Sequence, residues 1–134
     1  MVEIKRKFKA HGVTPSIQRM LIYQYIENER NHPSVDMIYS ALKSKAATLS
    51  RTTVYNNVTL FVEKGLLIPL LTKEAETRYD LAEPAHSHFL CLKCGQIYDI
   101  PSMRCQSGCV PDGFHVQNTQ VYLQGLCSRC RNNE

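Results

Sequence analysis

The chain has 134 residues, of which 43% are hydrophobic, and it carries a formal net charge of +4. This length and composition allow a sizeable core in one or two small domains. The sequence has no run of about 18 apolar residues, and its basic start is not followed by the apolar stretch of a signal peptide. We therefore expect a cytoplasmic protein without a membrane span, in which paired cysteines more often bind metal than form disulfides. A secreted, disulfide-bonded protein is the alternative.

The positive charge lies entirely in the first part of the chain. Residues 1–80 contain 12 Lys and Arg against 8 Asp and Glu, whereas residues 81–134 contain 4 of each kind. A basic N-terminal part suits an anionic partner such as nucleic acid. A modest positive charge also occurs on ordinary solvated surfaces, so the charge supports this interpretation without establishing it.

Four helices are predicted in the first 65 residues. Ile4 and Phe8 have helical spacing in a basic segment that ends at Ala10. Thr14 followed by Pro15 predicts the cap and the first turn of a second helix, which runs to about residue 29. Its expected apolar face is formed by Ile17, Leu21, Ile22, Tyr25 and Ile26.

The third and fourth helices each begin after a serine. Ser34 is expected to cap a helix whose buried side chains are Val35, Ile38, Tyr39 and Leu42. Ser50 is expected to cap a helix over residues 51–64, which Gly65 ends. The predicted apolar face of this fourth helix is formed by Val54, Val58, Phe61 and Val62.

Two short strands are predicted next, over residues 66–71 and 77–81, joined by a charged turn. Helices followed by a β-hairpin are the order of a winged helix-turn-helix domain, in which the helix after Ser50 would enter the major groove of double-stranded DNA. A helical packing domain with a solvated polar face is the alternative. The residues that we expect to contact phosphates and base edges are Arg51, Thr52, Thr53, Tyr55 and Asn56.

A short hinge around Pro84 predicts a boundary between two domains, over residues 1–82 and 83–134. After the hinge, residues 88–100 are expected to form two strands that turn at Cys94 and Gly95. Residues 114–125 form a further β-rich run, with Val116, Val121 and Leu123 as apolar positions. We therefore predict an α+β protein with a winged helix followed by a small second domain.

Two C-x2-C pairs, Cys91 with Cys94 and Cys127 with Cys130, predict a structural Zn²⁺ site, because soft thiolates at this spacing can surround a tetrahedral ion. A thioredoxin-type redox motif or two disulfides are the alternatives, but the redox motif should begin a helix in a βαβ unit, and none is predicted. Cys105 and Cys109 receive no role from the sequence. They are inert thiols, a disulfide or a redox accessory.

A second ligand set stands beside the first cysteine pair. His86 and His88 should point to the same face of a strand, because side chains alternate with period two. Together with Asp99 they offer the nitrogen and oxygen ligands that suit Fe²⁺, Mn²⁺ or Zn²⁺. The sequence has no glutamate beside this H-x-H motif to act as a base, so an enzyme with catalytic zinc is not expected.

Three segments resemble the ferric uptake regulator (Fur) family: residues 31–39 (NHPSVDMIY), 49–58 (LSRTTVYNNV) and 86–99 (HSHFLCLKCGQIYD). The resemblance extends over about residues 12–130. It implies a homodimeric, metal-dependent transcriptional repressor with an N-terminal winged helix, a C-terminal α/β dimerisation domain and a palindromic DNA operator. It also implies that Cys91, Cys94, Cys127 and Cys130 hold the structural zinc. A zinc-ribbon protein-interaction module is the alternative from another class.

Matching motif to motif, the resemblance implies a regulatory metal held by His32, Asp80, His86, His88 and Asp99. Three histidines with two aspartates are closest to the peroxide-sensing branch, in which Fe²⁺ or Mn²⁺ is bound. A regulator of iron or other metal uptake is the alternative. A metal bound by both domains would fix the two winged helices of a dimer at the spacing of successive major grooves, because it favours one conformation by differential affinity.

The sequence departs from the family pattern at two places. The segment between Asp99 and Gly113 is shorter than usual, so we expect the helix of this region to be reduced or missing. Family members often have a histidine in the strand before the last cysteine pair, whereas Asn118 and Thr119 stand there in this chain. We therefore expect the additional metal site of that position to be absent.

Overall fold

The computed structural model describes the chain except for residues 71, 73–74, 104–107, 117–118 and 134. The chain divides into two compact units, Met1–Pro84 and Ala85–Glu134. Cys105 and Asn118 lie outside the described residues. Among the described residues, no helix is long and apolar enough to cross a membrane.

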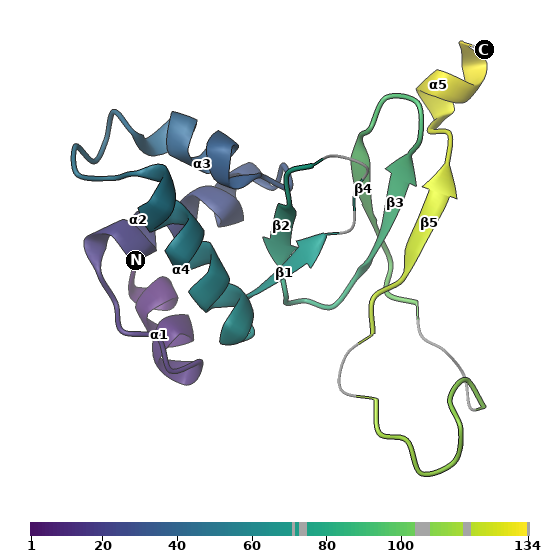
Figure 1. Ribbon diagram of the computed structural model, residues 1–134, viewed down its shortest axis with the longest axis horizontal. Helices are drawn as coiled ribbons and strands as arrows, with labels where there is room; N and C mark the ends of the chain where they lie inside the picture. The colour runs from purple at the N-terminus through teal and green to yellow at the C-terminus, as the bar shows by residue number, and fades with distance from the viewer. Residues whose placement is uncertain (71, 73–74, 104–107, 117–118, 134) are drawn as a thin grey trace. The chain divides into compact units, whose positions relative to one another are not determined.

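The first unit is a winged helix. Its helices are α1 (Val2–Ala10), α2 (Ile17–Glu29), α3 (Val35–Leu42) and α4 (Arg51–Glu63). The strands β1 (Leu67–Leu70) and β2 (Arg78–Leu81) follow and pair antiparallel as the wing (Figure 1). The predicted order of helices and hairpin is therefore confirmed.

Three aromatic rings from different helices meet at the centre of this unit. Phe8, Tyr23 and Phe61 have ring centroids 5.4 to 5.7 Å apart, and Tyr23 meets both phenylalanines edge-on. Phe8 and Phe61 are fully buried. Edge-to-face rings combine a large burial of apolar area with a favourable quadrupole orientation, so this cluster ties α1, α2 and α4 together.

The start of α2 differs from the prediction. Ser16, rather than Thr14, is the N-cap, and its hydroxyl accepts from the Arg19 amide over 3.2 Å. The Thr14 carbonyl instead accepts from the Arg19 side chain at 2.7 Å. Ile17 was predicted in the apolar face, but it is the first residue of the helix and 75% exposed, because the buried side begins one turn later at Ile22.

The caps of α3 and α4 were predicted correctly. Ser34 accepts from the Met37 amide, and Ser50 accepts from the Thr53 amide over 3.1 Å. Each serine satisfies one of the unpaired amides of a helix start. Gly65 follows α4 with φ +83°, a conformation that ends helices and that a residue with a side chain rarely adopts.

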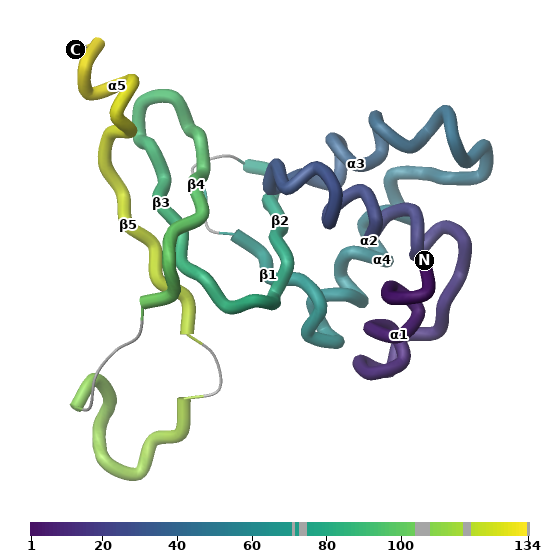
Figure 2. Tube along the Cα trace, turned by 180° about the vertical axis from the view of Figure 1, so that it is seen from behind, coloured from purple at the N-terminus to yellow at the C-terminus, as the bar shows by residue number. Residues whose placement is uncertain are grey.

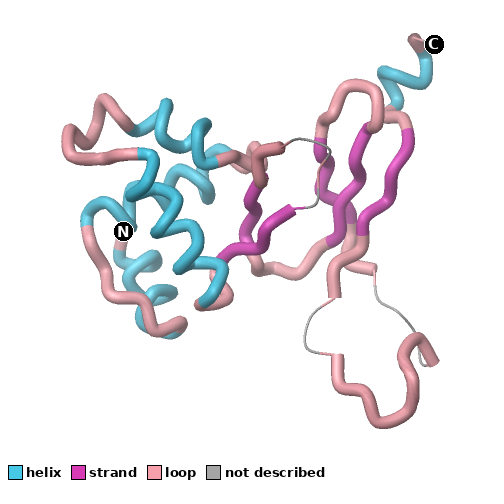
Figure 3. Tube along the Cα trace, viewed as in Figure 1, coloured by secondary structure: helices cyan, strands magenta, loops and turns pink. Residues whose placement is uncertain are grey.

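The second unit is a three-stranded sheet in the order β4-β3-β5 with a short terminal helix (Figures 2 and 3). Its elements are β3 (Ser87–Cys91), β4 (Ile97–Ile100), β5 (Tyr122–Gly125) and α5 (Ser128–Asn132). Strand β3 pairs antiparallel with β4 and parallel with β5. The described residues between β4 and β5 contain no helix.

The predicted strand over residues 114–125 is shorter in the structure. Among the described residues of this range, the strand is confined to Tyr122–Gly125, and Phe114 and Val116 are 68% and 50% exposed. These apolar side chains find no core to pack against, so β-propensity alone does not produce a strand there. Helix α5 was not predicted, since its five residues are too few for a helical hydrophobic pattern.

Candidate metal centres

The four paired cysteines gather at one end of the sheet in the second unit. Cys91 ends β3, Cys94 lies in the turn before β4, Cys127 caps α5, and Cys130 lies within α5. All four are free thiols, and their sulfur atoms lie within 4.8 Å of one another.

The separation of these sulfurs matches a zinc site. A tetrahedral Zn²⁺ with Zn–S bonds of about 2.3 Å holds its sulfurs about 3.8 Å apart. The sulfurs of Cys94 and Cys127 are 3.9 Å apart. Four thiol groups at this spacing would fill all four coordination positions of a zinc ion. No position would remain for water or substrate, so the cluster fits a structural rather than a catalytic zinc.

Hydrogen bonds lower the pKa of two of these thiols and so favour the thiolate form that binds a cation. The Cys127 amide donates to the Cys91 sulfur over 3.4 Å, and this bond, with a second from the Cys94 amide, lowers the pKa of Cys91 to about 5. The Cys130 amide and the Tyr98 hydroxyl lower the pKa of Cys127. Burial instead raises the pKa of Cys130 to about 12. Four thiolates therefore coexist only when a bound cation compensates their charge.

The same cysteines supply much of the second unit's interior. Cys91, Cys127 and Cys130 form a buried cluster against which Phe89 packs. Gly125 lies close to Phe89 across the β3–β5 pair, and a Cβ there would come within 3.3 Å of the Phe89 ring. Leu90 and Ile97 are the larger apolar side chains that are buried beside these thiols, so a zinc ion bound by the thiols would contribute directly to the folding of this unit.

A histidine–aspartate set lies along the β3–β4 hairpin. The register places His88 directly opposite Asp99, and His86 precedes β3. Nε2 atoms of both histidines lie 3.4 Å from Oδ1 of Asp99. The two imidazole rings are 4.6 Å apart, and Tyr122 of β5 stacks on His88 at 5.7 Å between centroids. The predicted common face of the histidines thus produces a real cluster.

These distances suit ligands of one ion better than direct hydrogen bonds. Donor atoms about 2.1 Å from a metal are separated by roughly 3.0 to 3.4 Å in octahedral or tetrahedral geometry. His88 is buried, whereas the Asp99 side chain is 35% exposed. The set therefore combines a fixed nitrogen ligand with a carboxylate that solvent can reach.

The first unit contains a pair of candidate ligands. Nε2 of His32 lies 3.4 Å from Oδ2 of Asp80, and both side chains are more than nine-tenths buried. His32 lies in the turn before α3, whereas Asp80 lies in β2. Two buried ligand groups at this separation can bind the same cation and together compensate for its removal from water, which one group alone would not do.

Arg78 holds this pair in place. Its Nε donates to the His32 carbonyl, and its Nη2 donates to the Asn31 carbonyl over 3.1 Å. His32 has φ +51°, which is uncommon for a residue with a side chain. The Tyr79 amide also donates to the Pro33 carbonyl over 3.0 Å, so the wing strand and the histidine turn are joined at several points.

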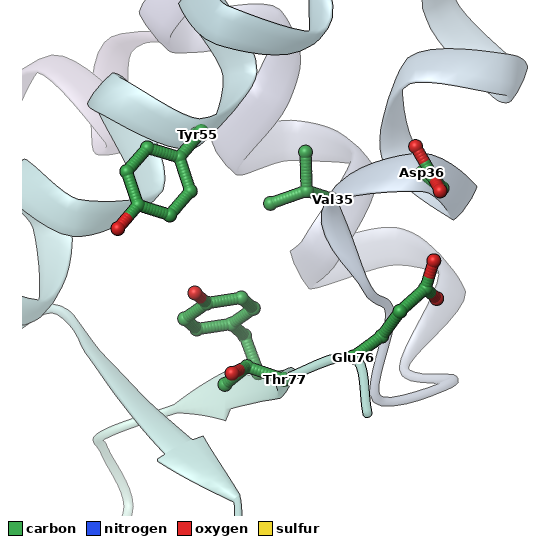
Figure 4. A pocket seen from close by; sticks show the side chains of 6 residues that line it. Val35, Asp36, Tyr55, Glu76 and Thr77 are labelled. Atoms are coloured by element: carbon green, nitrogen blue, oxygen red, sulfur yellow. The ribbon is translucent and has the colours of Figure 1, made fainter. Parts of the chain in front are cut away.

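The predicted nucleic-acid contacts lie on the outer side of α4. Arg51, Thr52, Tyr55 and Asn56 are exposed, and Thr53 is half-buried because it bonds the Ser50 cap. A cavity of about 190 Å³ opens beside this face, and Figure 4 shows Tyr55 on one side of it with Asp36 and Glu76 on the other. The described residues that line the cavity include two carboxylates and no histidine or cysteine.

Of the two remaining cysteines, Cys109 is disulfide-bonded. It is therefore not an inert thiol. Cys105 belongs to the segment outside the described residues.

The winged helix and the cluster of four cysteines define a class of metal-binding, DNA-associated regulators. Similarity to known proteins identifies the family within this class. The model of the Ferric uptake regulator family matches residues 10–124. The chain belongs to the ferric uptake regulator family, and its function is that of a metal-dependent transcriptional regulator.

Individual relatives span nearly the whole chain. The Peroxide operon regulator of Bacillus subtilis is 35% identical over 136 residues, covering 98% of this chain and 94% of its own. Manganese-bound ferric uptake regulator from Pseudomonas aeruginosa has a TM-score of 0.73 at 22% identity, covering 96% and 99% of the two chains. PerR from Streptococcus pyogenes, described as a peroxide sensor, has a TM-score of 0.55 at 26% identity and covers 96% and 90%.

Several supporting residues were missed by sequence reasoning. Arg78, Tyr98 and Tyr122 act through contacts that only the folded chain creates. Arg129 also donates to the Cys94 sulfur, and this contact raises the pKa of the guanidinium. The position of Arg129 between Cys127 and Cys130 could have indicated that it lies beside the cysteine cluster. The sequence alone does not show which atom its side chain contacts.

Replacing Cys130 by serine should remove the zinc and unfold the second unit. Structural zinc contributes about 10–16 kcal/mol in small zinc domains, which exceeds or matches the whole stability of a typical domain. Zinc measured after gel filtration should fall from one equivalent per chain to near zero. Amide signals of residues 85–133 should lose their dispersion while those of the first unit keep it.

Cys109→Ser is the matched control and should retain its zinc, because Cys109 is not among the four free thiols of the cluster. A Cys130→Ser chain that keeps one zinc and a folded sheet would contradict a structural role for the cluster.

Proposed function

We propose that this chain is a cytoplasmic, DNA-binding repressor that responds to peroxide through a regulatory Fe²⁺ or Mn²⁺. The observation that carries the proposal is the buried pair His32 and Asp80 within a winged-helix unit. An imidazole nitrogen and a carboxylate oxygen are ligand types that suit Fe²⁺ or Mn²⁺, and here they lie 3.4 Å apart in the interior of the DNA-binding unit. A metal that binds the pair couples the DNA-binding unit to the concentration of that metal.

Both ligand sets belong to one regulatory site in this proposal. His32 and Asp80 alone are two ligands, and His86, His88 and Asp99 are three. Together they make five nitrogen and oxygen donors, which suits Fe²⁺ or Mn²⁺ better than either part does. The family motif supports the same grouping.

Each residue has a separate task in this site. Asp99 accepts interactions from both histidines of its own unit and keeps their nitrogens converged. Arg78 keeps the His32 turn against the wing strand, so His32 can bind without reordering its backbone. A ligand that joins the two sets favours the arrangement of units in which both can reach it, and this selects one spacing of the DNA-binding helices.

Peroxide sensing is favoured over metal-uptake control by two observations. The 35% identical Bacillus subtilis relative is named a peroxide operon regulator, and both acidic positions of the set are aspartates. Bound Fe²⁺ would activate H₂O₂ for cleavage of its O–O bond. In the net reaction, one peroxide oxygen would be inserted at an imidazole C–H bond and the other would leave as water, so that the ring is oxidised by two electrons, the peroxide is reduced and the iron returns to Fe²⁺. A regulator of iron or other metal uptake is the second candidate, because solved relatives of that type share the fold.

The proposed DNA partner is a palindromic duplex, and the proposed assembly is a homodimer. In the sheet, Phe89 stands between Tyr98 of β4 and Leu123 of β5, so one face carries an apolar row. Tyr98 and Leu123 are 38% and 42% exposed. An apolar row on an open sheet with β5 at its edge supports burial against a second copy.

Metal analysis tests the two-site scheme. We expect one tightly held zinc and one exchangeable ion per chain, with a DNA mobility shift that needs Mn²⁺ and weakens as salt rises. His32→Ala and His88→Ala should each lower the affinity for Mn²⁺ by more than about 100-fold, since even outer partners of metal ligands cost about 10–100-fold. Both variants should keep their zinc.

His115→Ala is the control, because His115 is exposed and belongs to neither ligand set. Unchanged Mn²⁺ affinity in His32→Ala would confine the metal to the second unit. Loss of all metal at once upon chelation would overturn the scheme of two sites.

Mass spectrometry separates the peroxide sensor from the metal-uptake regulator. After H₂O₂ treatment of the Fe²⁺ form, a peptide containing His32 or His86 should gain the mass of one oxygen, and DNA should be released. The Mn²⁺ form should show neither change, because Mn²⁺ does not donate electrons to peroxide readily. An Fe²⁺ form whose histidines stay unmodified while it still binds DNA would favour the uptake regulator.

Sedimentation tests the dimer. Leu123→Lys places a charge on the apolar row of the edge strand, and a charge buried against a second copy is strongly unfavourable. We expect the variant to sediment as a monomer with its zinc retained. Val110→Lys, at a loop residue that is 41% exposed and so comparable to Leu123, should remain a dimer. A dimeric Leu123→Lys would exclude this face.

A further inference from the structure

Arg51, the first residue of α4, is held by two side chains of α3. Its Nε lies 2.7 Å from Oδ1 of Asp36, and its guanidinium carbon lies 4.6 Å from the centroid of the Tyr39 ring. The ion pair fixes one edge of the guanidinium, and the aromatic ring fixes its plane. An arginine without these contacts would sample many rotamers.

Tyr39 is a firm support for this contact. It is half-buried and packs against the core of the first unit. The bond from Arg51 also lowers the pKa of the Asp36 carboxyl, so Asp36 faces the guanidinium as a carboxylate. Asp36 and Glu76 lie on the same side of the cavity beside α4 (Figure 4).

Fold stability does not explain this arrangement. The side chains of Arg51 and Asp36 are 62% and 50% exposed. Ion pairs so open to water contribute little to stability. The pair does have a definite geometric effect: it occupies Nε and leaves the two terminal amino groups of Arg51 on the outer edge of the guanidinium.

That outer edge is the one that recognises guanine. The two terminal amino groups of an arginine can donate together to O6 and N7 of guanine in the major groove. Arg51 stands in the first turn of the helix that the winged-helix order directs into that groove. We propose that Arg51 is a specificity-determining residue that reads one guanine in each half of the operator, and that Asp36 and Tyr39 are its positioning residues.

The proposal rests on the DNA-binding function proposed above and adds a base and a mechanism to it. The rival explanation is that Asp36 and Glu76 merely oppose Arg51 and weaken its attraction to phosphates. The two explanations predict opposite effects of Asp36 on the affinity for DNA. A positioning carboxylate strengthens binding to one base, whereas an opposing carboxylate weakens binding to every duplex.

Selection from a random duplex library with the Mn²⁺-loaded protein tests the proposal. The unmodified chain should enrich an inverted repeat. Arg51→Ala should lose the preference for one guanine per half-site and keep the other positions. Asp36→Asn and Tyr39→Leu should weaken the same position. Arg6→Ala and Glu63→Gln, which change charges elsewhere in the unit, should leave the motif unchanged.

Affinity measurements on the selected duplex then quantify the contact. Arg51→Ala should bind it roughly 5- to 150-fold more weakly, and should lose little on a duplex in which that guanine is replaced. Asp36→Glu should recover part of what Asp36→Asn loses, since it restores the acceptor. Thermal unfolding of these variants should match that of the unmodified chain.

Three results would overturn the inference. Arg51→Ala could weaken all duplexes equally with a smaller salt dependence, which would make Arg51 a phosphate contact. Asp36→Asn could bind more tightly, which would make Asp36 an opposing charge. The variants could all enrich the unmodified motif. If the unmodified chain enriches no sequence, the proposed function itself fails.

Discussion

The antiparallel pairing of β3 with β4 brings together candidate ligands of both metal sites in the second unit. Its register puts His88 opposite Asp99, and its turn carries Cys94. His88 and Cys91 are three residues apart on β3, so their side chains leave opposite faces of the sheet. A slip of one residue would separate both ligand sets at once, because every side chain would change face. One hairpin therefore serves a structural and a sensing purpose.

In the first unit the corresponding constraint is the joint between the wing and the turn before α3. Arg78 binds two consecutive carbonyls of the turn, and Asp80, two residues along the same strand, faces His32. Residues two apart in a strand share a face, so one short strand carries both the arginine that binds the turn and the aspartate that we propose as a ligand. The left-handed backbone of His32 is maintained by these contacts rather than by local preference.

Much of this organisation could be predicted from the sequence, because its causes are local. Serine caps identify α3 and α4, and cysteine spacing identifies the cluster of four thiols. What could not be predicted depends on long-range contacts. The parallel pairing of β5 with β3 joins distant segments, and the backbone of His32 follows from Arg78. The prediction of where α2 begins was wrong for a different reason. Thr14 and Ser16 both flank Pro15, and both are residue types that cap helices.

The thiol-lined interior of the second unit has a consequence for the life of the chain in a cell. A newly synthesised chain can bury Phe8, Phe61 and their neighbours without any metal, whereas the described part of its second unit buries three thiol side chains beside two larger apolar ones, Leu90 and Ile97. We therefore expect the zinc supply to determine whether the second unit of a new chain folds, before any regulatory metal binds. A chain made during zinc shortage would carry a folded DNA-binding half attached to an open, protease-sensitive tail, and we expect it to be degraded before it binds the regulatory metal.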